Sequence, residues 1–224
     1  MRHNRISLDG VIYAPCVNGW SVHSLELDNN RKTVKIPETV RGSKVVRIRN
    51  SAFYNNKHIT EVYLPATIES IEDRAFYSCE NLQRIVVSGQ NPKGMRLGRA
   101  AFYNCKNLKS FKQSVELDGA YVFQNCFQLE SISTIGDIPV GAFWGDYNLK
   151  LVHIFPFASD NNVHVENGAF TGCSNLKTIY CYAQEIKMYE KELSTFASTD
   201  IYCEADSNLW DLFYQGYKIK ETKW

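Results

Sequence analysis

A short frame centred on phenylalanine recurs along this chain and limits its fold more than any other feature of the sequence. Each copy begins with Ala-Phe, or once with Val-Phe, and has a small or polar residue three positions later and an aliphatic residue six positions later. Copies that recur every 20 to 27 residues indicate a solenoid or another repeat array. The six phenylalanines are Phe53, Phe76, Phe102, Phe123, Phe143 and Phe170.

The later positions of the frame recur together with the phenylalanine. The third positions hold Asn56, Cys79, Cys105, Cys126, Asp146 and Cys173, and the sixth positions hold Ile59, Leu82, Leu108, Leu129, Leu149 and Leu176. A seventh, degenerate copy has Phe196 with Thr199 and Tyr202. Because three linked positions match in six copies, we interpret each copy as one coil of a regular structure.

Each coil is predicted to contain two extended pieces. Apolar and polar residues alternate after the sixth position, as in residues 176–181, which is typical of a short strand. A second apolar pair, such as Ile68 and Ile71, precedes the next phenylalanine, and Ala-Phe itself is expected in a tight helical turn. Since one coil cannot cover its own apolar side, the coils must stack on their neighbours.

The recurring phenylalanines and cysteines are predicted to form the core. Burying one Phe contributes about 1.5–3 kcal/mol, and cysteine in a core behaves as a small hydrophobe. We therefore expect a buried, unbridged ladder of the four third-position cysteines: Cys79, Cys105, Cys126 and Cys173. The other three, Cys16, Cys181 and Cys203, lie outside the frame, so one pairing among them stays open.

One segment of the chain carries the repeat almost completely, and it resembles a known family. Residues 63–79, Tyr-Leu-Pro-Ala-Thr-Ile-Glu-Ser-Ile-Glu-Asp-Arg-Ala-Phe-Tyr-Ser-Cys, are similar to the unit of the BspA-like leucine-rich repeat family (LRR_5-type, Treponema-type). The resemblance covers roughly residues 34–203. Most copies lack the proline after the strand, and Asn56 and Asp146 stand where the family has cysteine, which suggests irregular coils.

The resemblance implies an α/β repeat solenoid. Its coils would be right-handed and its overall course curved, with a parallel β-sheet on the concave side, short second strands and helical turns. Members of the family are usually exported or surface-attached proteins that bind other macromolecules.

The two ends are predicted to cap the stack, which would otherwise expose its terminal apolar faces. Residues 6–28 contain the turn signals Asp9-Gly10 and Asn18-Gly19 and predict a β-hairpin. Residues 206–214 have leucines and a phenylalanine at helical spacing, and residues 217–220 fit a final strand. We interpret residues 1–224 as one leucine-rich-repeat domain, with an N-terminal cap at 1–33, repeats at 34–203 and a C-terminal cap at 204–224.

The polar positions of the main strands are the candidate binding residues. Their side chains should face outward on the concave sheet, because the alternate positions point into the core. Tyr and Arg typically anchor protein interfaces, and aromatic side chains could also stack on sugar rings; the competing interpretation is a solvated face without a partner. The candidates are Glu61, Tyr63, Arg84, Val86, Lys112, Ser131, His153, Tyr180 and Tyr202.

Composition excludes several other classes of protein. The 25 Lys and Arg residues nearly balance the 24 Asp and Glu residues, and no basic run is present, which argues against nucleic-acid binding. No apolar stretch approaches the roughly 20 residues that span a bilayer, and residues 1–6 lack the apolar region of a signal peptide. We therefore expect either a cytosolic protein or one whose leader has been removed.

No motif in the sequence predicts catalysis. Cys-x-x-Cys, His-x-x-x-His, a P-loop and Gly-x-Ser-x-Gly are absent, and the five histidines have no recurring partner. We expect no catalytic residue, metal site or cofactor. The leading hypothesis is a non-catalytic interaction module of a bacterial cell-surface or secreted protein that binds a protein or glycan. The alternatives are an enzyme or accessory subunit whose active site is assembled from dispersed residues, and an intracellular scaffold.

Overall fold

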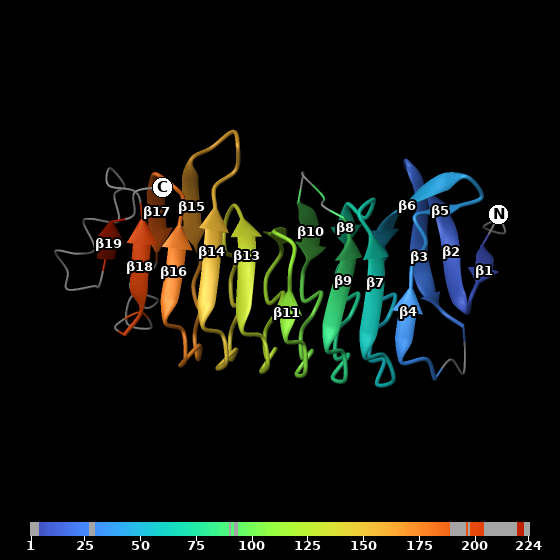
Figure 1. The fold of residues 1–224 in the computed structure, drawn as a ribbon, viewed down its shortest axis with the longest axis horizontal. Coiled ribbons are helices and arrows are strands. Elements are labelled where there is room, and N and C mark those ends of the chain that lie inside the picture. Colours follow the sequence, from blue (N-terminus) through green and yellow to red (C-terminus); the bar gives the residue numbers. More distant parts are fainter. Residues whose placement is uncertain are drawn as a thin grey trace.

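The chain forms an elongated stack of coils, with the first and the last described strands at opposite ends of the stack (Figure 1). The computed structural model describes residues 5–26, 30–89, 91, 94–188, 196, 198–203 and 219–221. No helix in these ranges is long and apolar enough to span a membrane.

Nine strands lie side by side in one parallel sheet, which we call the main sheet (Figure 1). Six of them begin two residues after a sixth-position aliphatic residue, which confirms the strands predicted there. In order, the nine are β4 (Thr33–Lys35), β7 (Glu61–Pro65), β9 (Arg84–Ser88), β11 (Ser110–Phe111), β13 (Ser131–Ile135), β14 (Leu151–Phe155), β16 (Thr178–Cys181), β18 (Asp200–Cys203) and β19 (Ile219–Glu221).

The second extended piece of the coil is also confirmed. Four such strands pair in parallel one after another: β6 (Ser43–Ile48), β8 (Ser70–Ile71), β10 (Met95–Gly98) and β12 (Val115–Asp118). Two later ones, β15 (Asn162–Val165) and β17 (Glu185–Met188), form a separate parallel pair. The short strand β5 (Thr39–Val40) lies antiparallel to β6.

At the N-terminal end, β1 (Ile6–Leu8), β2 (Val11–Cys16) and β3 (Gly19–Leu25) are successively antiparallel. Both predicted turns are present, and they produce two hairpins rather than one. β3 then pairs in parallel with β6, which joins the hairpins to the stack. At the other end β19 pairs with β18, close to the predicted final strand, whereas the helix predicted at 206–214 lies outside the described residues.

The helical turn expected at Ala-Phe is not confirmed. In the third coil, Ala100 and Asn104 have φ of 52° and 58°, and this left-handed conformation interrupts a helix. Their N–H groups and that of Phe102 instead donate to carbonyls of the next coil, at 2.8 to 2.9 Å. The intervening N–H groups, those of Ala101 and Tyr103, donate to carbonyls three residues earlier and close four-residue turns. The described residues therefore form a β-solenoid with almost no helix, and the α/β class inferred from the sequence is corrected to that extent.

The core is a continuous stack of the frame phenylalanines. Neighbouring rings from Phe53 to Phe170 are nearly parallel, with centroids 4.8 to 5.8 Å apart. The last contact, between Phe170 and Phe196, is edge-to-face at 5.5 Å. All of these side chains are buried, which confirms the predicted spine.

The third-position cysteines are buried beside this spine, as predicted. Each thiol donates a hydrogen bond to the phenylalanine carbonyl of the preceding coil, at 3.0 to 3.2 Å. Burial raises the pKa of the Cys79 thiol to about 12, so it stays protonated at neutral pH and can donate this bond. None of the seven cysteines, all of which are described, is in a disulfide, so Cys16, Cys181 and Cys203 are not paired with one another.

Candidate interaction surface

The outward side chains of the main sheet form two rows that run across the strands. In β14, for example, Val152 and Ile154 are buried, whereas Leu151, His153 and Phe155 are only partly covered. Strand register therefore brings residues from separate coils next to one another. The first row is Thr33, Glu61, Arg84, Ser110, Ser131, Leu151, Thr178 and Asp200. The second row contains Lys35, Tyr63 and Val86, then Ser133, His153, Tyr180, Tyr202 and Lys220.

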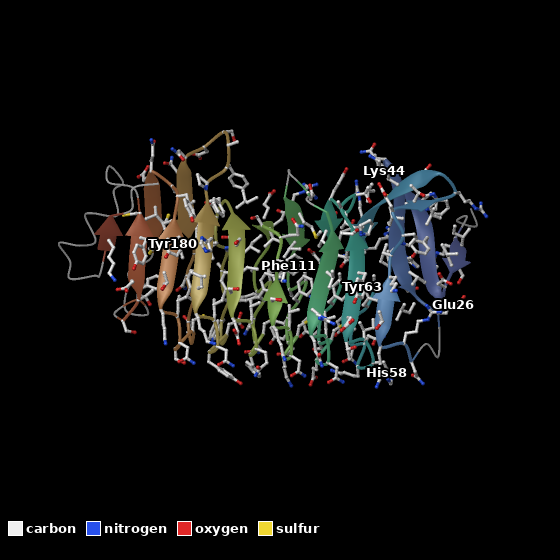
Figure 2. The ribbon with its side chains drawn as sticks, in the orientation of Figure 1. Glu26, Lys44, His58, Tyr63, Phe111 and Tyr180 are labelled. Carbon is white, nitrogen blue, oxygen red and sulfur yellow. The ribbon has the colours of Figure 1, made fainter. Side chains whose placement is uncertain are left out.

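The structure places eight of the nine predicted binding residues on these rows. Glu61, Arg84 and Ser131 lie on the first row, and the other five lie on the second. Lys112 is the exception, because it follows the end of β11 and belongs to no strand. Figure 2 shows Tyr63 and Tyr180 on the same face of the main sheet, on either side of β11.

An ion pair with an aromatic neighbour occupies the N-terminal part of this surface. Arg84 donates to Glu61 Oε1 through Nε at 2.9 Å and also through Nη2, and the hydroxyl of Tyr63 donates to Glu61 Oε2 at 3.1 Å. The bond from Arg84 lowers the pKa of Glu61. Lys35 Nζ lies 5.7 Å from the centroid of the Tyr63 ring.

A hollow of about 760 Å³ opens beside this group. Glu61, Tyr63, Arg84 and Val86 border it on one side, and Lys109 and Lys112 border it on the other. The hollow lies where β11, with only two residues, is shorter than the five-residue strands around it. We call it the β11 hollow.

Five ring side chains, His153, Phe155, Tyr180, Tyr182 and Tyr202, form an aromatic row over β14, β16 and β18. The centroids are 4.9 Å apart for His153 and Tyr180, 4.8 Å for Tyr180 and Tyr202, and 4.4 Å for Phe155 and Tyr182. Because each ring covers the face of its neighbour, the row presents mainly ring edges and hydroxyl groups to solvent.

Hydrogen bonds hold the aromatic row at both ends. His153 Nδ1 and the Tyr182 hydroxyl are 3.0 Å apart, and burial lowers the pKa of His153, which favours a neutral imidazole. At the other end, Lys220 Nζ donates to the Tyr202 hydroxyl at 3.4 Å and to Asp200 Oδ2 at 2.6 Å, and it lies 5.3 Å from the Tyr202 centroid.

Sequence reasoning missed part of this surface. Phe155 and Tyr182 lie one residue beyond the runs that were interpreted as strands, and following the alternation for one more position would have found both. The candidates also left out Lys35 and Lys220, whose strands lie outside the copies of the frame, and Asp200, which precedes the candidate Tyr202 in the degenerate seventh copy. The β11 hollow depends on the length of one strand, for which the sequence offers no clear signal.

No group of three or more His, Cys, Asp or Glu side chains within the described ranges could hold a metal ion. The side chains that gather on the main sheet are instead aromatic, basic and hydroxyl groups, which suit non-covalent recognition.

Comparison with family models matches this chain to the BspA type leucine rich repeat region. Six copies match, over residues 28–150 and 97–208. These ranges include every coil of the main repeat and extend slightly beyond the 34–203 expected from the sequence. No curated protein matches the chain in sequence.

Two solved structures share the fold. A leucine rich cell surface protein from Faecalibacterium prausnitzii has a TM-score of 0.68 at 22% identity, over 91% of this chain and 55% of that protein. The leucine rich repeat protein of T. pallidum has a TM-score of 0.64 at 19% identity, over 97% of this chain and 98% of that one. This chain therefore spans about half the length of the first relative and nearly all of the second.

Proposed function

The chain belongs to the BspA-type leucine-rich repeat family, and from this we propose that it is a non-catalytic interaction module that binds another protein through the outer face of the main sheet. Solenoids of this kind expose one extended surface to which every coil contributes. A partner could span several coils, since a standard interface buries about 800 Å² on each side.

The aromatic row is the observation that carries this proposal. Tyrosines are enriched among the residues that anchor protein interfaces, and here Tyr180 and Tyr202 stack with centroids 4.8 Å apart. Their mutual packing fixes the side chains before binding, so less conformational entropy is lost when a partner docks. The hydroxyl groups at the ring tips supply hydrogen bonds at the same place.

We further propose that the protein acts at the cell surface or after secretion, with adhesion as its role. The support is the relative from Faecalibacterium prausnitzii, which is described as a cell surface protein, together with the family itself. A cell-surface location would give the exposed main sheet access to macromolecules outside the cell.

A capture experiment with matched tyrosine variants tests the proposed function. The wild-type protein, a Tyr180→Ala/Tyr202→Ala variant and a Tyr54→Ala/Tyr77→Ala variant are immobilised and exposed to a mixture of extracellular proteins. Tyr54 and Tyr77 also stack, with centroids 5.1 Å apart, but they lie in the turns outside the main sheet. The second variant therefore removes the same chemistry from another surface.

The expected result is a protein held by the wild type and by the Tyr54/Tyr77 variant but lost from the Tyr180/Tyr202 variant. Binding that survives in the Tyr180/Tyr202 variant and disappears in the Tyr54/Tyr77 variant would place the contact on the turn side and overturn the proposal.

A further inference from the structure

We propose that the β11 hollow binds an anionic saccharide, that is, a sugar chain bearing carboxylate or sulfate groups, at a site separate from the aromatic row. This inference does not depend on the protein-binding role proposed above, because it rests on a different part of the main sheet.

The shape of the hollow follows from the unusual strand β11. Phe111 turns inward, where it is buried and meets the ring of Phe102 edge-to-face at 5.6 Å. The chain then leaves the sheet, so β9 pairs with β11 only at Arg84 and Ile85. The outward side of the sheet is left recessed at this coil, with a volume of about 760 Å³ that falls in the range of small-molecule sites.

The charge of the hollow favours an anion. Arg84, Lys109 and Lys112 line it against a single carboxylate, Glu61, which leaves an excess of two positive charges. Glu61 is already paired with Arg84. The amino groups of Lys109 and Lys112 are exposed and form no ion pair within the described part of the chain. Both amino groups are therefore available to a negatively charged ligand.

The remaining lining suits a sugar ring. Tyr63 has Lys35 over its ring on one side, and on the other side its register neighbour is the shorter Val86, so a ring face borders the hollow. The C–H face of a pyranose can pack on an aromatic face of this kind. Polar side chains that also line the hollow can bind sugar hydroxyls: Gln83, Ser110 and, through its amide oxygen, Gln113, whose Nε2 donates to the Gly89 carbonyl.

The aromatic row does not offer the same arrangement. Its rings stack on one another, so their faces are already occupied, and the sugar stacking considered for these aromatics from the sequence is better assigned to Tyr63. An acidic peptide would satisfy the lysines but leave the Tyr63 ring face unused, and the part of β9 that β11 leaves unpaired is only residues 86–88, which is short for main-chain pairing with an added strand. We therefore favour a saccharide over an acidic peptide.

Isothermal titration calorimetry with defined oligosaccharides tests the inference. The probes are tetragalacturonate, its neutral methyl ester, a sulfated tetrasaccharide and tetraglutamate. We expect tetragalacturonate or the sulfated sugar to bind the wild type, and the methyl ester and tetraglutamate to bind at least about tenfold more weakly, as expected when a charge-assisted contact or the ring contact is lost. The tighter binder of the two anionic sugars shows whether the hollow prefers carboxylate or sulfate.

Lysine variants localise the binding. Lys109→Gln/Lys112→Gln should weaken binding at least about tenfold, whereas Lys177→Gln, an exposed lysine at the equivalent place before β16, should leave it unchanged. Tyr63→Leu should also weaken it, with thermal unfolding used to confirm the fold. If Tyr63→Leu fails to fold, the lysine variants still show whether the sugar binds in the β11 hollow.

Several outcomes would overturn the inference. One is that neither anionic sugar binds the wild type. Another is that the methyl ester or tetraglutamate binds as tightly as the anionic sugars. A third is that Lys177→Gln weakens sugar binding as much as Lys109→Gln/Lys112→Gln does. Tyr180→Ala should leave sugar binding intact, which separates this site from the proposed protein interface.

Discussion

The carboxyl group of Asp146 accepts a hydrogen bond from the backbone N–H of Cys126, with 2.7 Å between Oδ1 and nitrogen. Its other oxygen, Oδ2, has no partner among the described residues, although the side chain is fully buried. Burial therefore raises the pKa of Asp146 well above its ordinary value. Asp146 stands where four other coils have a cysteine that donates to a phenylalanine carbonyl, and it interrupts that ladder.

Restoring the cysteine at this position should stabilise the protein. Asp146→Cys removes the unpartnered oxygen and adds a thiol that can donate to the carbonyl of Phe123. We expect a gain of about 1–3 kcal/mol in the free energy of unfolding at pH 7, measured by chemical denaturation. A variant less stable than the wild type at pH 7 would contradict this account of Asp146.

The gain from Asp146→Cys should also depend on pH. The folded pKa of Asp146 lies above its unfolded value, so the folded state binds more protons and the wild type loses stability as pH rises above about 4. Relative to the variant, the wild type should therefore be most stable near pH 4 and progressively less stable toward pH 7. Denaturation curves at several pH values check the sign, and a constant difference would show that Asp146 does not titrate abnormally.

The phenylalanine stack predicts a contrast between neighbouring aromatic residues. Phe102 is fully buried between two coils, whereas Tyr103 is partly exposed and stacks on Tyr77 with centroids 4.7 Å apart. Phe102→Ala should cost about 3–5 kcal/mol because it leaves a cavity that the coils cannot close. Tyr103→Ala should cost much less. Equal losses of unfolding free energy in the two variants would show that the frame has been assigned in the wrong register.

The ladder cysteines should be unreactive in the folded protein. Cys79, Cys105, Cys126 and Cys173 are buried, whereas Cys16 is partly exposed. Thiol labelling followed by mass spectrometry should therefore modify Cys16 first and reach the ladder only in denaturant. Rapid labelling of the ladder in the native state, or disulfides between its members, would rule out the buried thiol ladder.

The imidazole of His153 should titrate below pH 6.5, its ordinary pKa, because burial disfavours the charged form. The pKa of His153 is lower in the folded protein than in the unfolded chain, so the unfolded chain binds more protons. This histidine should therefore lower the free energy of unfolding as pH falls below about 6.5. An NMR titration of the ring protons gives the midpoint directly. A His153 midpoint above 6.5 would be evidence against its placement in the aromatic row.

The frame predicted most of the fold because burial follows its periodicity. Positions such as Phe76, Cys79 and Leu82 recur with fixed spacing, and all three are buried. The turns were harder to predict because their left-handed positions are occupied in four coils by residues such as Ser51, Arg74, Ala100 and Tyr121, which give no local signal. Among the six regular copies, only those of Phe143 and Phe170 have the informative residue, glycine, at this position, as Gly141 and Gly168.

The candidate surface was predictable where it depends on alternation and unpredictable where it depends on packing between coils. Tyr63 and Tyr180 follow from the strand pattern and lie on the expected face. The stacking of His153 on Tyr180 requires the register between two strands 27 residues apart in sequence, and the β11 hollow requires the inward turn of Phe111. Neither can be derived from one coil considered alone.

The most direct test of the proposed function is the affinity of Tyr180→Ala for the protein partner recovered in the capture experiment, measured by surface plasmon resonance beside Tyr54→Ala. The account predicts that Tyr180→Ala weakens binding by at least about 1–2 kcal/mol, as expected for an interface anchor, while its thermal stability stays close to that of the wild type and Tyr54→Ala binds normally. Unchanged affinity in Tyr180→Ala, with losses confined to Tyr54→Ala or to substitutions in the N-terminal hairpins, would contradict it.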